Sequence, residues 1–296
     1  MDSRVSRSIG LFRLFLDSTD RPVYLLFSGG RDSMAVLALS SMLPERYIRR
    51  LTVVYVNLVG NTAEVNRRVA IEAARRLGYR DHIVVECRRD PCTMDIEPPE
   101  AGFIEIRAYS RNGLPFHEAL RAYGPPVSVK PHGLWCRREY KLYKVMYLPV
   151  WPKVLYSVMG MRRSESTRRA GRVGGPLFTN ILRRGRHARL QVSLLPIWDW
   201  GEDDVERVVE EAGLGDLLEP YRVAGDSLNC IYCPFKSYEK ALGTLKALVE
   251  RPDWGLDAAV ELCRALEGLR PTPGTRSFKV VEAWRRACRE ADLSNS

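Results

Sequence analysis

The stretch YLLFSGGRDSMAVLAL, residues 24–39, constrains the fold more than any other part of the chain. A continuous apolar run ends in small and polar residues, Ser28 to Ser33, and a second apolar run follows. The first run is typical of a strand buried on both faces of a parallel sheet. The two glycines favour a tight turn, because glycine adopts backbone conformations that other residues avoid. The stretch therefore predicts a buried strand, a turn and a helix.

Buried strands and amphipathic helices alternate along much of the remaining sequence. Strands are predicted at 21–27, 51–58, 82–87, 153–159 and 191–197, and helices at the N-terminus, 32–42, 62–77, 136–147, 201–212, 237–268 (interrupted near Pro252) and 277–291. Residues 88–135 are rich in Pro and Gly, and we expect only short elements there. This order predicts an α/β fold with a doubly wound, mainly parallel sheet. We expect a nucleotide-binding domain at 1–200 and a smaller, mostly helical region at 201–296.

The composition bounds the class of protein. The chain has 296 residues with 45% hydrophobic and 28% charged residues, as in ordinary globular proteins. No apolar run approaches the length of a membrane span, and the charged first helix does not resemble a signal peptide. A cytoplasmic protein without membrane contact is therefore expected, and a homo-oligomer is compatible with the sequence. The formal net charge of +10, mostly from Arg, favours an anionic ligand or a nucleic acid, although an Arg-rich surface alone would give the same excess.

The chain has seven cysteines, an odd number, and no secretion signal. We therefore expect no disulfide framework, and a metal site, a cluster or reactive thiols instead.

The turn at Ser28–Ser33 is a candidate anion site. A glycine-rich turn between a buried strand and a helix presents backbone N–H groups to an anion. Gly29 and Gly30 permit close approach, Ser28 and Ser33 add hydroxyl groups, and Asp32 is a candidate ligand for a phosphate-bound Mg²⁺. The alternative is a tight turn with an ordinary helix start.

The segment S-G-G-R-D-S resembles the pyrophosphate-binding signature S-G-G-x-D-S of the ATP pyrophosphatase (PP-loop) superfamily, with Arg31 where Lys is usual. The resemblance implies an adenine nucleotide alpha hydrolase-like fold. It also implies that ATP is bound and cleaved between its α- and β-phosphates, so that AMP is loaded onto a substrate. The end of the second strand, with Asn57, would lie near the ribose or adenine.

The stretch VMGMRRSESTRRA, residues 158–170, follows the predicted strand at 153–159. Arginines there can hold phosphate or sulfate oxygens. The spacing G-x-R-x-x-E-S-x-x-R resembles the phosphoadenosine-phosphosulfate-reductase-like branch of the superfamily. The resemblance implies nucleotide contacts from Gly160, Arg162, Glu165 and Ser166, and charge stabilisation by Arg162 and Arg169 as pyrophosphate leaves, with Asp32 as the third catalytic residue. The alternative is a solvated basic loop.

A third motif, LNCIYCPF at residues 228–235, contains C-x-x-C followed by Pro. Two thiolates at this spacing can converge on one ion. The segment also resembles the same branch, and we predict one site from Cys136, Cys230 and Cys233 that holds an iron–sulfur cluster or Zn²⁺. His132 and Cys263 are weaker candidates for a fourth ligand. The alternative is a pair of buried thiols or a redox pair.

Two features favour ATP use over reduction of adenylyl sulfate or its 3′-phosphate. Reductases of this branch use a C-terminal cysteine within a motif like E-C-G-x-H, and Cys288 has no such surroundings. The S-G-G-x-D-S signature is also intact. The resemblance implies a transferase that adenylates a nucleic acid or small molecule for sulfur transfer, with a sulfur-donor or reductant protein as a partner. The alternatives are a reductase and a nucleotide- or nucleic-acid-binding subunit without turnover.

Residues 162–189 carry nine arginines and one acidic residue, Glu165. Several glycines predict a flexible loop. A basic loop beside a nucleotide pocket can follow a polyanion such as a nucleic acid. The alternative is a solvated loop that contacts only the phosphates of ATP.

Overall fold

The computed structural model describes residues 2–88, 99–110, 112–125, 154–165, 174–184 and 187–293. The described residues form a seven-stranded sheet in the order β3-β4-β2-β1-β5-β7-β6. Its strands are β1 Val23–Phe27, β2 Leu51–Leu58, β3 His82–Cys87, β4 Phe103–Ala108, β5 Val154–Met159, β6 Leu177–Arg184 and β7 His187–Leu194. All pairings are parallel except that of β6 with β7. The predicted α/β class with a mainly parallel sheet is confirmed.

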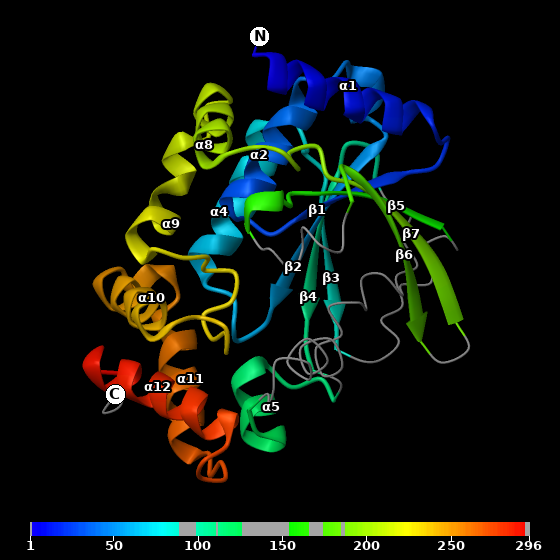
Figure 1. The fold of residues 1–296 in the computed structure, drawn as a ribbon. Helices are drawn as coiled ribbons and strands as arrows, with labels where there is room; N and C mark the ends of the chain where they lie inside the picture. Colours follow the sequence, from blue (N-terminus) through cyan, green and yellow to red (C-terminus); the bar gives the residue numbers. More distant parts are fainter. Residues whose placement is uncertain are drawn as a thin grey trace.

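The described helices follow the alternation expected from the sequence. They are α1 Ser3–Asp17, α2 Arg31–Ser41, α3 Glu45–Ile48, α4 Glu64–Arg76, α5 Phe116–Tyr123, α8 Glu202–Glu211, α9 Glu219–Ala224, α10 Tyr238–Glu250, α11 Leu256–Gly268 and α12 Arg276–Glu290. Helices α2, α4 and α8 lie on one side of the sheet, and α10, α11 and α12 gather at the C-terminal end of the chain (Figure 1). The helix predicted at 136–147 lies outside the described residues.

Strand β1 is buried on both faces, as its continuous apolar sequence requires. Leu25 and Phe27 belong to the main core, which extends from α1 to α12. Tyr24, which points to the opposite face because side chains alternate along a strand, belongs to a second cluster with Val54 and Leu155. The two clusters fix the position and register of β1 within the sheet.

The strand order places a topological switch point beside β1. The chain moves from β1 to β2 on one side, and later returns to place β5 on the other side of β1. In open α/β sheets, ligands bind in the crevice outside the carboxyl ends of the strands at such a point. Residue 28 follows β1 and residue 160 follows β5, so both sequence motifs emerge at this crevice.

Two parts of the sheet differ from the sequence expectation. No individual strand was predicted within residues 88–135, but β4 from that segment lies between β2 and β3 as an interior strand. Residues 177–184, expected within a loop, form β6 and pair antiparallel with β7. The predicted loop is wrong for this segment.

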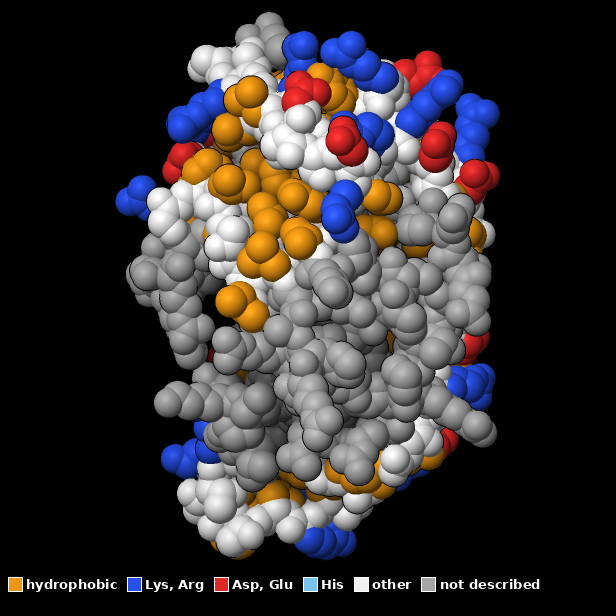
Figure 2. All heavy atoms as spheres, turned by 90° about the vertical axis from the view of Figure 1, so that its right-hand side faces the viewer, with side chains coloured by type: hydrophobic (Ala, Val, Ile, Leu, Met, Phe, Trp, Pro, Cys, Tyr) orange, Lys and Arg blue, Asp and Glu red, His pale blue; other side chains and the backbone are white. Residues whose placement is uncertain are grey.

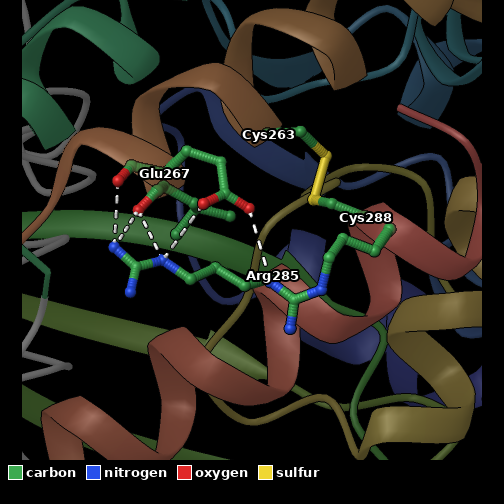
Figure 3. Close-up of a disulfide and its surroundings, with 6 residues drawn as sticks. Cys263, Glu267, Arg285 and Cys288 are labelled. Atoms are coloured by element: carbon green, nitrogen blue, oxygen red, sulfur yellow. Dashed lines mark hydrogen bonds and ion pairs between the residues drawn. A yellow bond between two sulfur atoms is a disulfide. The ribbon is translucent and has the colours of Figure 1, made fainter. Parts of the chain in front are cut away.

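The sequence predicted no disulfide framework, yet the structure contains a disulfide. Cys263 and Cys288 form a disulfide between α11 and α12, with 5.8 Å between their Cα atoms (Figure 3). Both are buried on the facing sides of the two helices, 1% and 0% exposed, and helical packing therefore brings their sulfurs together. Cys263 belongs to the core, as its helical position suggested, and this bond removes it as a fourth metal ligand.

The surface contains one region rich in apolar side chains. In Figure 2 hydrophobic side chains gather on the side of the molecule where β5, β6 and β7 lie in Figure 1. Leu177 and Ile181 of β6 are each 56% exposed. Among the described residues, no helix has the length and apolar character that crossing a membrane requires.

Candidate functional site

The turn between β1 and α2 is held by its two serines. The Ser28 N–H donates to Ser33 Oγ (3.2 Å), the two hydroxyl oxygens lie 3.0 Å apart, and Ser33 Oγ donates to the Gly30 carbonyl (2.9 Å). Gly30 is the residue before the first turn of α2. The first N–H groups of a helix have no intrahelical partner and carry partial positive charge, so this turn directs donors toward the crevice.

Gly29 is required by its conformation and by its neighbour. Its φ is +73°, a left-handed value that favours glycine, and a Cβ there would lie 2.8 Å from Nδ2 of Asn66. Asn66 is a buried residue of α4, and its Oδ1 accepts a hydrogen bond from Tyr55 Oη at 2.7 Å. The side chain of Asn66 therefore lies against Gly29 of the turn. This contact was not predicted from the sequence, although a polar residue on the apolar face of α4 could have indicated it.

Gly160 lies against the start of α2. A Cβ at this position would lie 2.6 Å from the Asp32 carbonyl carbon and oxygen and from the Ser33 nitrogen. The end of β5 therefore approaches the backbone of the anion turn as closely as two main chains allow. In the structure the space that a Cβ would need is taken by the backbone of α2. The nucleotide contact that the resemblance implies for Gly160 stays a prediction.

Arg162 is almost fully buried, at 5% exposed, and pairs with Asp32. Its Nε donates to Asp32 Oδ1 at 2.9 Å, and its Nη2 lies 3.7 Å from Glu202 Oε1. The side chain of Asp32 is 13% exposed. The structure thus brings together two residues from distant motifs, one after β1 and one after β5, and fixes their orientation by a charge-assisted hydrogen bond.

The guanidinium of Arg31 contacts residues of α8 and α9. Its Nη1 and Nη2 lie 3.2 Å from carboxylate oxygens of Glu206 and Glu202. Its guanidinium also lies over the ring of Tyr221, 4.6 Å from the centroid. These acidic partners were missed in the sequence, because a charged helix surface gives no signal for which carboxylates face the turn.

Asn57, predicted to lie near a ribose or adenine, forms a hydrogen bond to a residue of the adjacent strand β4. Its Nδ2 donates to Oε1 of Glu105 on β4 at 3.1 Å. Glu105 is fully buried, and Arg67 Nε and Arg107 Nε also donate to Oε1, at 2.7 and 3.2 Å. Burial alone would raise the pKa of Glu105, but hydrogen bonds from Arg67 and Asn57 outweigh it, and the pKa is lowered. The network explains how a carboxylate occupies an interior strand.

The C-x-x-C segment is attached to the loop that follows β2. Asn61 Nδ2 donates to the Tyr232 carbonyl (3.1 Å), and the Tyr232 N–H donates to Asn61 Oδ1 (2.8 Å). The hydroxyl of Thr62 donates to the Asn229 carbonyl at 2.9 Å. Because strands β1 and β2 are neighbours, this attachment brings the segment that contains Cys230 and Cys233 to the same edge of the sheet as the anion turn.

Lys236, three residues after Cys233, links the C-x-x-C segment to residues before it and to α10. Its Nζ, on a side chain that is 5% exposed, donates to the Ser227 carbonyl and to Thr244 Oγ1, each at 2.9 Å. Burial raises the pKa of the Cys233 thiol, opposed by backbone hydrogen bonds from Phe235 and by the Lys236 charge. The net effect is a raised pKa, so the neutral thiol is favoured, and the donors of the turn offset only part of the cost of a thiolate.

The C-terminal helices support the segment through an aromatic contact. Tyr232, between the two cysteines, packs against Trp284 of α12 with 4.9 Å between ring centroids. Arg285 of the same helix donates to the carbonyls of Leu266 and Leu269 at the end of α11. The disulfide and these hydrogen bonds join α11 to α12 (Figure 3).

Some predicted residues lie outside the described part of the chain. These are His132, Cys136, Ser166 and Arg169, and the side chain of Glu165 also lies outside it. Within the described residues no group of three or more His, Cys, Asp or Glu side chains is arranged to hold a metal ion. The predicted set Cys136, Cys230 and Cys233 therefore stays a prediction.

The described residues form an open α/β sheet with the Ser28–Ser33 turn, a candidate anion site, at its topological switch point. No protein-family model matches the sequence, and no curated protein matches it. A crystal structure of phosphoadenylyl-sulfate (PAPS) reductase from Candida auris, a phosphate complex, is similar with a TM-score of 0.43 and 11% identity, covering 72% of this chain and 83% of that chain. The similarity is one of fold.

Proposed function

We propose that this protein binds ATP with Mg²⁺ at the Ser28–Ser33 turn and cleaves the bond between its α- and β-phosphates. The observation that carries the proposal is the turn itself. The turn lies at the switch point of the sheet, where parallel strands β1, β2 and β5 are neighbours. It contains a glycine in the left-handed conformation, two serines whose hydroxyls are hydrogen-bonded to each other, and the start of α2. This combination suits the pyrophosphate part of a nucleotide, because several backbone donors converge on one small region.

The roles of the charged residues follow from their positions. An acceptor oxygen attacks the α-phosphorus, the bond from that phosphorus to the bridging oxygen breaks, and Mg²⁺-pyrophosphate leaves while AMP stays on the acceptor. Asp32 would contribute a carboxylate to Mg²⁺, which neutralises phosphate charge when bound. Arg162, fixed beside Asp32 at 2.9 Å, would stabilise charge on the leaving group. Arg169 would act with it.

We propose that sulfur transfer is the purpose of the activation. The C-x-x-C segment is hydrogen-bonded to the loop after β2, one strand away from the anion turn. Two thiols in a turn with its own N–H donors suit an iron–sulfur cluster or Zn²⁺, with Cys136 as a further ligand. The acceptor would be a nucleic acid or a small molecule, and a sulfur-donor or reductant protein would complete the reaction.

The surroundings of Cys288 favour ATP use over sulfate reduction. A reductase of the resembling branch attacks sulfate with an accessible cysteine near the C-terminus. Cys288 is 0% exposed and bonded to Cys263, so it does not provide such a nucleophile.

The test compares the two chemistries directly. Purified protein is incubated with Mg²⁺ and ATP in the presence of candidate acceptors, and pyrophosphate is measured. In parallel, sulfite is measured from adenylyl sulfate and from its 3′-phosphate with a thiol reductant. We expect pyrophosphate and no sulfite. Sulfite without pyrophosphate would establish the reductase alternative, and tight ATP binding without either product would establish a binding subunit.

A further inference from the structure

Two arginines lie beside the anion turn, and both form ion pairs with carboxylates. Arg31 is the first residue of α2, and Arg162 follows β5 on the other side of the turn. Arg162 pairs with Asp32, and Arg31 pairs with Glu206. A third carboxylate, Glu202, contacts both arginines.

Glu202 joins the two guanidiniums through a single oxygen. Its Oε1 lies 3.2 Å from Arg31 Nη2 and 3.7 Å from Arg162 Nη2. This is the arrangement that a phosphate oxygen adopts between two arginines, since carboxylate and phosphate oxygens accept the same guanidinium donors.

The three carboxylates differ in how easily they are displaced. Asp32 is 13% exposed and its partner Arg162 is 6% exposed, so their hydrogen bond is protected from water. The side chain of Glu202 is 64% exposed. An exposed ion pair contributes little to stability, because water solvates its charges when it opens. Glu202 is therefore the partner that an entering anion replaces at the lowest cost.

We propose that Glu202 sets the affinity and the metal dependence of the anion turn by occupying the phosphate-binding donors of Arg31 and Arg162. This inference rests on the proposed binding of ATP at the same turn. A phosphate oxygen must displace the Glu202 carboxylate to reach both arginines. Glu202 then remains nearby, at the first turn of α8, where the helix N-terminus stabilises its charge.

The charges around the turn also bear on whether it prefers Mg·ATP or free ATP. Asp32, Glu202 and Glu206 together carry one more negative charge than Arg31 and Arg162 neutralise. Free ATP, which is more negative than its Mg²⁺ complex, is therefore repelled more strongly. Glu202 accordingly makes the turn prefer the metal complex over the free nucleotide.

The experiment measures equilibrium binding by titration calorimetry for wild type, Glu202→Gln and Glu210→Gln, each with Mg·ATP and with ATP in EDTA. Glu210 is the matched control, because it is an exposed glutamate of the same helix whose partner is Arg222, 3.1 Å away. Circular dichroism confirms that each variant is folded.

We expect Glu202→Gln to tighten Mg·ATP binding by about two- to fivefold, the range for losing weak exposed ion pairs. Binding of free ATP tightens by a larger factor, both gains shrink at high salt, and Glu210→Gln behaves as wild type. If wild type binds Mg·ATP and Glu202→Gln binds it equally or more weakly, this inference fails alone. If neither protein binds ATP or its Mg²⁺ complex, the proposed function fails and this inference fails with it.

Discussion

Gly160 illustrates how one residue can fit a sequence motif for a different physical reason. The resemblance implied a nucleotide contact from this glycine. In the structure a Cβ at residue 160 would lie only 2.6 Å from backbone atoms of Asp32 and Ser33. The residue therefore acts by allowing β5 and α2 to meet at the switch point. Gly160 therefore affects the site by setting the distance between the end of β5 and the start of α2.

We predict that Gly160→Ala destabilises the protein by about 1–3 kcal/mol, the usual cost of forcing extra volume into a packed position. The atoms nearest to this Cβ position are backbone atoms of Asp32 and Ser33, so no side chain can rotate away. Urea denaturation measures the change. Gly10→Ala in α1 is the control, because nothing lies within 4 Å of its Cβ position, and it should stabilise by roughly 0.5–1 kcal/mol. Equal midpoints for Gly160→Ala and wild type would contradict the close approach.

The sequence indicated the anion turn itself but not the surroundings of its charged residues. Ser28, Gly29, Gly30 and Ser33 are adjacent in the chain, so their arrangement follows from local structure. The partners of Arg31 are about 170 residues away and come from α8. Such contacts depend on how α8 packs on α2, which no local pattern specifies.

At the scale of elements, most buried strands and amphipathic helices were predictable, whereas strands β4 and β6 were not. Strands β2 and β3 begin and end at the predicted residues. Strand β4 was missed because Glu105 and Arg107 interrupt a six-residue segment. It lies inside the sheet only because Arg67 and Asn57 compensate the buried carboxylate. These partners lie on α4 and β2, so the local sequence of β4 does not indicate them.

The pair α11 and α12 is closed by the disulfide, which spans 25 residues. We predict that Cys263→Ala/Cys288→Ala loses about 3 kcal/mol of unfolding free energy without reductant, since a loop of this size restricts the unfolded chain by that amount. Because Trp284 packs on Tyr232, hydrogen exchange in residues 228–235 should also become faster.

Chemical denaturation with and without reductant provides the comparison. The difference between wild type and the double variant should shrink when wild type is reduced. Equal stability of the two proteins under non-reducing conditions would show that the bond does not form in solution.

At the scale of the whole molecule, strand order brings together motifs that are distant in sequence. The alternation of elements predicted a doubly wound sheet, and the neighbours of β1 then determine where β5 and the loop after β2 must emerge. The position of the switch point could not be read from the sequence, because the insertion of β4 and the β6–β7 hairpin had no clear signal. The helices beyond residue 200 share one continuous core with α2 and α4.

The central claim is that the Ser28–Ser33 turn binds the pyrophosphate part of ATP. The most direct measurement is competition at equilibrium, in which Mg²⁺-pyrophosphate displaces a fluorescent ATP analogue from the wild-type protein. We predict displacement by Mg²⁺-pyrophosphate and by ATP, with both lost in Gly29→Val, whose side chain would meet Asn66 and require a left-handed backbone. Adenylyl sulfate binding with no binding of ATP or pyrophosphate would contradict the account.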